Sequence, residues 1–161
     1  MTRKVLIKIS GLQITDGEDD NVEVITTGDY FLKNGRHYII YDEVMEGFEG
    51  NVRNMLKITP DKLDVCKNGA ANAHMVFEQD RRNQTRYVTA MGEMIMEVST
   101  NRISLEEQED SLKMKVDYSL DINYSHVSDC NITVDVCSME RAKLDLWAET
   151  VHEEQSVVDR A

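Results

Sequence analysis

The densest group of chemically active side chains in this sequence is an acidic run at residues 16–21. Asp16, Glu18 and Asp20 alternate as the first ligands of a calcium-binding loop do. Such a loop also needs a glycine at its sixth position and a bidentate glutamate at its twelfth. Those positions hold Asn21 and Thr27, so we interpret the run as a solvated hairpin loop and expect no calcium site there.

The histidines and cysteines are scattered along the chain and form no metal-binding motif. The histidines are His37, His74, His126 and His152, and the cysteines are Cys66, Cys130 and Cys137. A zinc site needs three or four converging ligands, so the sequence predicts neither a metal nor a cofactor. An odd number of cysteines without CxxC spacing indicates free thiols in a reducing compartment. Cys130 and Cys137 lie seven apart, so on one strand they would face opposite sides.

Motifs for nucleophilic catalysis or phosphate binding are also missing. The sequence contains no G-x-S-x-G, no G-x-G-x-x-G and no P-loop. If the protein were an enzyme, Glu43, Glu78 and Arg86 would be the first residues to inspect for shifted pKa values. We predict no catalytic residue, and the sequence favours a non-catalytic role without deciding the question.

Charge and hydropathy narrow the partners. The 161 residues carry 18 basic and 30 acidic side chains, a formal net charge of −12. This acidic protein would be repelled by nucleic acids and by anionic membranes, so we expect neither as a partner. No apolar run reaches the length of a signal peptide or a transmembrane helix. We therefore expect a cytoplasmic protein.

The elements that must position any site are β-strands, because apolar and polar residues alternate almost throughout. In residues 112–124 every even position is apolar or tyrosine and every odd position is polar, which predicts a long strand with one wet face. Asn34-Gly35 between two apolar runs predicts a hairpin. Further segments, among them 94–98 and a separate one around Ile103 and Leu105, bring the total to about ten short strands, typical of an antiparallel barrel or sandwich.

The tail follows a different pattern. Leu144, Trp147, Ala148 and Val151 are spaced as one face of a helix, although residues 142–148 also alternate and could extend the last strand. We prefer a short helix and divide the chain into a barrel at 1–138 and a partly helical C-terminal extension at 139–161. The apolar stripe could pack on the barrel, cap it, or join two copies into a homo-oligomer.

Several fragments, in order and spacing, resemble one known family. They are YIIYDE at 38–43, MEGFEG at 45–50, LKI at 56–58, NG at 68–69, MVFE at 75–78, YVT at 87–89 with Gly92, ST at 99–100, and YSL at 118–120. Together they resemble the YwiB-like family of uncharacterised bacterial proteins over residues 3–137. The resemblance implies a lipocalin-type, calycin-like β-barrel of unknown function and supplies no site residues. Ala90-Met91 and the tail depart from the family pattern.

We therefore expect an all-β, antiparallel, lipocalin- or calycin-like closed barrel of about 8–10 strands with a short C-terminal helix. A barrel of this size is either filled by side chains or holds one small ligand. Our preferred function is non-catalytic binding of a small, mostly apolar molecule in the interior. The expected ligand-binding residues are Tyr87, Met94, Met96, Met114 and Tyr118. The alternative is a structural or interaction protein with a filled barrel that uses its acidic exterior or its C-terminal helix.

Overall fold

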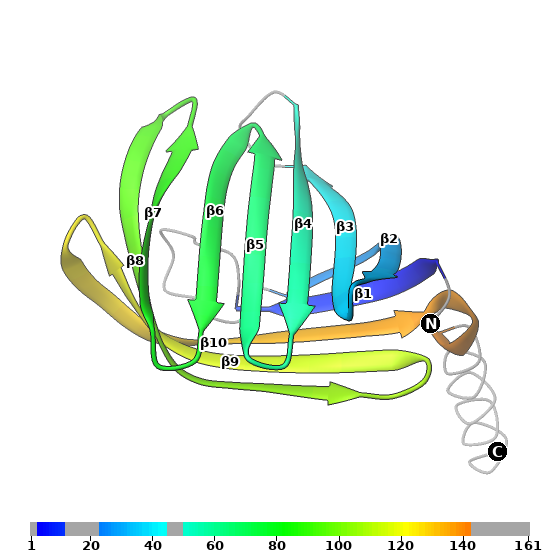
Figure 1. The fold of residues 1–161 in the computed structure, drawn as a ribbon. Helices are drawn as coiled ribbons and strands as arrows, with labels where there is room; N and C mark the ends of the chain where they lie inside the picture. The colour runs from blue at the N-terminus through cyan, green and yellow to red at the C-terminus, as the bar shows by residue number, and fades with distance from the viewer. Residues whose placement is uncertain (1–2, 12–22, 45–49, 143–161) are drawn as a thin grey trace, which may run out of the picture.

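The computed structural model describes residues 3–11, 23–44 and 50–142, and most of them lie in β-strands (Figure 1). The strands are β1 (Lys4–Ser10), β2 (Glu23–Lys33), β3 (Arg36–Val44), β4 (Asn51–Thr59), β5 (Lys62–Gly69), β6 (Ala71–Glu78), β7 (Arg82–Thr89), β8 (Gly92–Glu107), β9 (Ser111–Ile122) and β10 (Ser125–Ser138).

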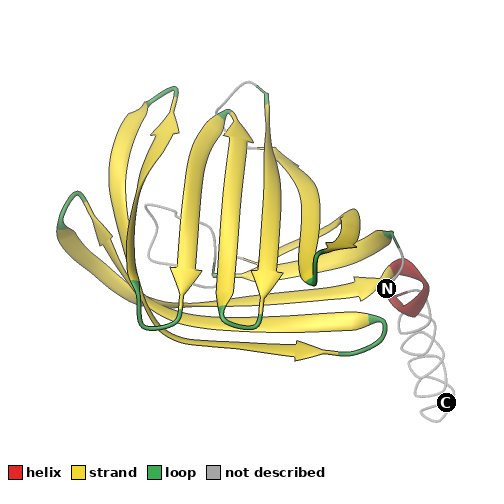
Figure 2. Ribbon diagram, in the orientation of Figure 1, coloured by secondary structure: helices red, strands yellow, loops and turns green. Residues whose placement is uncertain are grey.

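The strands form one closed antiparallel barrel. Each strand pairs with the next along the chain, and β1 pairs with both β2 and β10, which closes the sheet. The closed barrel predicted from the alternating sequence is confirmed, and a two-layer sandwich is excluded because the sheet returns to its first strand. Tight turns join β4 to β5 and β6 to β7 at one end, which we call the lower end. The β5–β6 and β7–β8 turns lie at the upper end (Figure 2).

Alternation decides which side chains fill the interior. In β9 the even positions Leu112, Met114, Val116 and Leu120 are buried, whereas Lys115 and Asp117 are exposed. The same rhythm in the other strands creates one continuous apolar core. Full burial of an aliphatic or aromatic side chain contributes about 1.5–3 kcal/mol, so this core is the main source of stability.

The long predicted strand ends earlier than the alternation suggested. β9 stops at Ile122, because Asn123 and Tyr124 take positive φ angles of 49° and 69° and form the turn to β10. Tyr124 is consequently exposed and does not continue the apolar face. The predicted turn at Asn34-Gly35 is confirmed, with φ angles of 54° and 75°, as a type I′ hairpin requires.

The separate strand expected around Ile103 and Leu105 is instead the second half of β8. A register irregularity between Thr100 and Arg102 inserts one extra residue into β8. The inward positions therefore change from even numbers, such as Val98, to odd numbers, such as Ile103. A bulge of this kind bends a strand without ending it.

The β6–β7 pairing is sparse. Its register consists of Ala71 with Thr89 and Asn72 with Val88. Farther down, the side-chain amide of Asn83 donates to the backbone carbonyl of Val76 at 3.0 Å. A side chain thus supplies a contact where most other strands of the barrel use backbone hydrogen bonds.

The last strand leads directly into a helical turn. β10 ends at Ser138, and residues 139–142 are helical, so the short C-terminal helix is confirmed. The Ser138 hydroxyl accepts a hydrogen bond from the Arg141 backbone N–H at 3.2 Å, as an N-cap serine does. The predicted stripe from Leu144 to Val151 lies outside the described residues. Within the described ranges, no helix is long and apolar enough to cross a membrane.

Candidate ligand-binding recess

All five residues predicted to bind a ligand belong to the interior of the barrel. Met96, Met114 and Tyr118 are part of the buried core, whereas Tyr87 and Met94 are partly buried and pack against it. Tyr87 and Met94 are cross-strand partners in β7 and β8. The structure therefore separates the prediction into a packed group below and an accessible pair at the upper end.

The exposure of inward-facing side chains rises toward the upper end. Along β9, Val116 is fully buried and Leu120 nearly so, whereas Ile122 is partly exposed. Along β10, Ile132 is fully buried and Cys130 is partly exposed. The interior is therefore packed in its lower part, whereas at the upper end apolar side chains that point inward are partly exposed. We call this end of the interior the upper recess.

Aromatic packing fills the middle of the barrel. The rings of Phe77 on β6 and Tyr118 on β9 meet edge to face, with centroids 4.9 Å apart. The Tyr118 hydroxyl donates to the Gly11 carbonyl at 3.4 Å. Burial, with a smaller contribution from Cys130, raises the pKa of Tyr118. The phenol therefore stays protonated and acts as a packing element at neutral pH.

The lower end is tied together by a tyrosine–histidine–glutamate chain. The Tyr30 hydroxyl lies 2.7 Å from Nδ1 of His37, and Nε2 of His37 faces the Glu107 carboxylate. Since a carboxylate only accepts, Nε2–H donates to Glu107, and in the neutral imidazole the Tyr30 O–H then donates to Nδ1. Burial raises the pKa of Tyr30, with a smaller effect from Glu107. The phenol therefore remains a hydrogen-bond donor and a poor nucleophile, and the chain links β2 and β3 to the end of β8.

Three polar side chains interrupt the apolar interior beside the upper recess. The Lys67 ammonium donates to Oε1 of Glu43 and to Oδ1 of Asn54, each at 2.8 Å. The Asn54 amide donates to the same Glu43 oxygen at 3.0 Å. Asn54 is fully buried, and the Lys67 side chain is 7% exposed. We call Glu43, Asn54 and Lys67 the polar cluster.

Two tyrosines lie within the electrostatic reach of this cluster. Burial raises the pKa of Tyr41 and of Tyr87, and the negative charge of Glu43 raises both further. Both phenols are therefore neutral at physiological pH. The upper recess thus presents an apolar wall, two neutral hydroxyls and an internally paired charge.

The sequence reasoning missed Asn54 and Lys67. Both occupy inward positions of strands that are otherwise apolar, Asn54 between Val52 and Leu56, and Lys67 two residues after Val65. A polar residue at an apolar position in two consecutive strands was the available signal. The pairing of those two residues across β4 and β5 depends on the register, which alternation alone does not give.

The three residues considered for catalysis do not converge. Glu43 belongs to the polar cluster, Arg86 lies on the outer face and pairs with Glu93, and Glu78 ends β6 at the lower end. No group of three metal-binding side chains forms in the part of the chain that the structure describes. The acidic run at 16–21 is outside that part.

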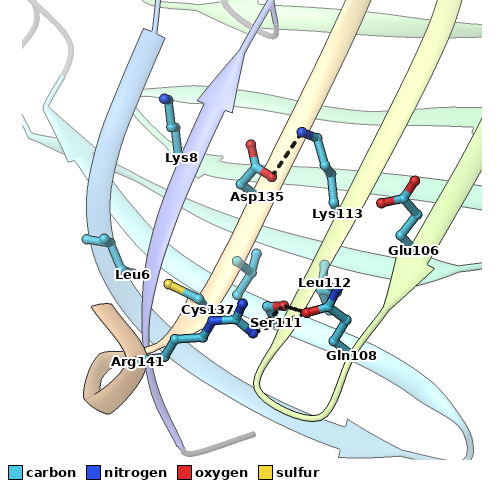
Figure 3. A pocket seen from close by; sticks show the side chains of 11 residues that line it. Leu6, Lys8, Glu106, Gln108, Ser111, Leu112, Lys113, Asp135, Cys137 and Arg141 are labelled. Carbon is cyan, nitrogen blue, oxygen red and sulfur yellow. Dashed lines mark hydrogen bonds and ion pairs between the residues drawn. The ribbon is translucent and has the colours of Figure 1, made fainter. Parts of the chain in front are cut away.

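A groove on the outer wall is a separate feature. It encloses about 340 Å³ between the start of the C-terminal helix and strands β1, β8, β9 and β10 (Figure 3). Lys113 pairs with Asp135 at 3.8 Å, and Arg141 donates to Gln108 and Ser111. Lys113 and Asp135 therefore neutralise each other, whereas the Arg141 guanidinium is held by two neutral side chains.

The three cysteines are free thiols, as predicted. Cys130 packs against the core, whereas Cys137 lines the outer groove. The expected opposite orientation of these two residues is confirmed. Burial raises the pKa of Cys66, with a further contribution from Asp64, so this thiol is less reactive than an ordinary one.

Comparison with known proteins gives three matches. Residues 7–134 match the family described as "Domain of unknown function (DUF1934)". The chain is 25% identical over 120 residues to the uncharacterised β-barrel protein YwiB of Bacillus subtilis (strain 168), which covers 73% of this chain and 83% of the relative. It is also similar to the crystal structure of the ywiB protein from Bacillus subtilis, with a TM-score of 0.71, 22% identity, and coverage of 84% of this chain and 92% of that one.

Proposed function

This chain belongs to the DUF1934 family, a domain of unknown function, and we propose that it binds a small, mostly apolar molecule in the upper recess of its barrel. Binding is non-catalytic, and the molecule contacts Tyr87 and Met94 first. Met96, Met114 and Tyr118 form the floor beneath it. The resemblance to a lipocalin-type barrel, implied by the sequence, agrees with this role but does not carry it.

The observation that carries the proposal is the exposure of apolar side chains that point inward. In a fully packed barrel, Tyr87, Met94 and Ile122 would be as buried as Leu120 below them. They are instead partly exposed while still packing against the core. Removing apolar surface from water contributes about 25 cal/mol per Å², so these side chains favour an apolar occupant over water. The methionine supplies an adaptable, polarisable contact.

The test is a fluorescence titration of the full chain with N-phenyl-1-naphthylamine, a small neutral dye that brightens in apolar surroundings. We expect saturable binding to one site. Met94→Trp should fill the recess and weaken binding by roughly ten-fold, which corresponds to about 1.4 kcal/mol. Met91→Trp is the matched control, because Met91 lies in the β7–β8 turn and is 85% exposed.

Two outcomes would contradict the proposal. The dye could fail to bind, or both tryptophan variants could bind it as the wild type does. Either result would favour the alternative of a filled barrel that acts as a structural or interaction protein. Native mass spectrometry of the purified chain is a second readout, and it should show a co-purified apolar molecule that Met94→Trp displaces.

The proposed place of action is the cytoplasm. The three thiols are free in the structure, and proteins with unpaired cysteines are typical of reducing compartments. Fractionation of cells that produce the protein would test this point. Recovery with an extracytoplasmic marker would contradict it.

A further inference from the structure

The polar cluster and its neighbours form a continuous row across the upper recess. Tyr41 is the cross-strand partner of Asn54, Asn54 is the partner of Lys67, and Lys67 is the partner of Ala73. These positions share the inward face of β3, β4, β5 and β6. Tyr87 lies at the same level on β7, because Thr89, two residues later, pairs with Ala71. The row therefore crosses the inward face of five neighbouring strands.

The charges in this row are already balanced. The Lys67 Nζ donates one hydrogen bond to Oε1 of Glu43 and another to Oδ1 of Asn54, both at 2.8 Å. A carboxylate ligand would have to compete with Glu43 for the same ammonium, and would come close to the Glu43 charge. Like charges in a poorly solvated site repel strongly. Lys67 is therefore not a free counter-ion for an anionic ligand.

The hydroxyls are the groups with hydrogen-bonding capacity left over. Tyr41 is 4% exposed and points inward. Among the residues that the structure describes, none forms a hydrogen bond with the Tyr41 or the Tyr87 hydroxyl. Neither oxygen is among the fully buried, unpartnered polar atoms of the described residues, so both keep some solvent contact and can hydrogen-bond to an occupant. Both phenols are neutral, because burial raises their pKa values and the Glu43 charge raises them further.

The inward face of β6 carries small side chains beside these hydroxyls. β6 contributes alanine at two successive inward positions, Ala71, which is fully buried, and Ala73. Ala73 is the cross-strand neighbour of Lys67 and is partly exposed. The side chain of β6 between the polar cluster and Tyr87 is therefore a methyl group, and no bulky side chain of that strand separates them.

We propose that the upper recess selects apolar molecules whose polar end is an uncharged hydroxyl or carbonyl group, and rejects those that end in a carboxylate or sulfonate. Tyr41 and Tyr87 hydrogen-bond to the uncharged end, and Glu43 repels an anionic one. This inference rests on the proposed binding function and adds the chemical class of the ligand.

Competition experiments with the wild-type chain test the inference directly. N-phenyl-1-naphthylamine is the reporter, and 1-decanol, methyl decanoate and sodium decanoate are the competitors at pH 8. Decanol and the methyl ester should displace the dye at concentrations at least roughly ten-fold below that of decanoate, a difference of about 1.4 kcal/mol. 1-Anilinonaphthalene-8-sulfonate adds a sulfonate to the aromatic skeleton of N-phenyl-1-naphthylamine. In direct titrations it should bind more weakly than the neutral dye.

Variants identify the residues responsible. Tyr41→Phe and Tyr87→Phe each remove one hydroxyl and should weaken decanol binding by roughly three- to ten-fold, the effect of one hydrogen bond. Glu43→Gln should reduce the preference for decanol over decanoate to less than roughly three-fold, since the repelling charge is gone. Tyr38→Phe is the control, because Tyr38 stacks on Phe31 outside the recess.

The outcomes separate the two proposals. If the dye binds but decanoate competes as well as decanol and the ester, the inference on ligand class is overturned and the binding function stands. The same holds if Glu43→Gln, shown to be folded by circular dichroism, keeps the full preference. If the dye does not bind the wild type at all, both proposals fail. The wild-type comparison needs no variant, so a variant that misfolds does not remove the test.

Discussion

Replacing Lys67 by methionine is the perturbation that examines the polar cluster most directly. Methionine keeps the length and much of the volume of the side chain but removes its charge and its donors. Glu43 then loses its counter-ion, and the fully buried Asn54 loses the donor to Oδ1. Breaking a buried ion pair by removing one partner is destabilising because it leaves the other charge uncompensated.

The structure sets the expected magnitude. Removing one partner of a buried pair costs about 3–5 kcal/mol. The Glu43 side chain is 16% exposed, so its carboxylate keeps some contact with water, and we expect a loss of about 3 kcal/mol, at the lower end of that range. Lys113→Met is the matched control, because Lys113 and Asp135 pair at 3.8 Å with both side chains about 40% exposed. The control should change stability by less than about 0.5 kcal/mol.

Urea unfolding followed by circular dichroism gives the free energy of unfolding, and an unchanged m-value shows that the comparison is valid. A third variant, Glu43→Leu with Asn54→Leu and Lys67→Met, removes every member of the cluster. Its stability should return to within about 1 kcal/mol of the wild type, because an apolar replacement of a buried pair leaves nothing unpaired. A loss below about 0.5 kcal/mol in Lys67→Met alone, or an equal loss in Lys113→Met, would refute the reasoning.

Three further predictions concern the rest of the barrel. Burial raises the pKa of Tyr118 above its ordinary value, so the folded state keeps this proton to higher pH than the unfolded chain. The free energy of unfolding should be constant below pH 10 and then fall by up to about 1.4 kcal/mol per pH unit. Urea unfolding from pH 8 to 11 should show a smaller fall in Tyr118→Phe than in the wild type, and equal slopes would contradict the prediction. The Thr100 hydroxyl is buried without a partner in the described part of the chain, so Thr100→Val should be neutral or gain up to about 1 kcal/mol in urea unfolding, and a clear loss would mean that an unseen group satisfies it. A Cβ at Gly28 would lie 2.4 Å from the Ile40 carbonyl oxygen and 2.7 Å from the Ile7 side chain. Gly28→Ala should therefore lower the thermal midpoint and reduce the free energy of unfolding by about 2 kcal/mol. An unchanged midpoint would show that β2 and β3 can move apart.

Much of the fold could be predicted from the sequence because alternate residues of a strand face the core and the solvent, so apolar residues recur with a period of two. The inward rows of β1, β4, β9 and β10 are apolar at alternate positions, apart from Asn54 in β4 and Ser138 at the end of β10. The exclusion of apolar groups from water favours that pattern whatever the partner strand is. The hairpin at Asn34-Gly35 could also be predicted, since Asn-Gly is one of the few pairs that adopt two consecutive positive φ angles. The bulge in β8 could not be predicted, because the inward-facing residues change from even to odd positions without a proline or glycine at the change.

The candidate site was predictable only in part, for a related reason. Tyr87 and Met94 carry the parity of the interior, so the sequence placed them inside the barrel. It did not distinguish them from Met114, because depth along the barrel axis depends on how ten strands are staggered. The exposure gradient along β9 and β10 is a property of the closed barrel and of no single strand.

By itself, the sequence determined that the chain forms strands, which side of most strands faces inward, and where most of the turns fall. These are local matters of backbone conformation and of the exclusion of apolar groups from water. The tertiary structure alone decided that Tyr41, Asn54 and Lys67 stand in one row beside Glu43, because cross-strand register joins residues that are 11 to 24 positions apart. A polar side chain at an inward position is unfavourable in isolation. It is tolerated in the folded barrel only because strand pairing brings its partners within hydrogen-bonding distance.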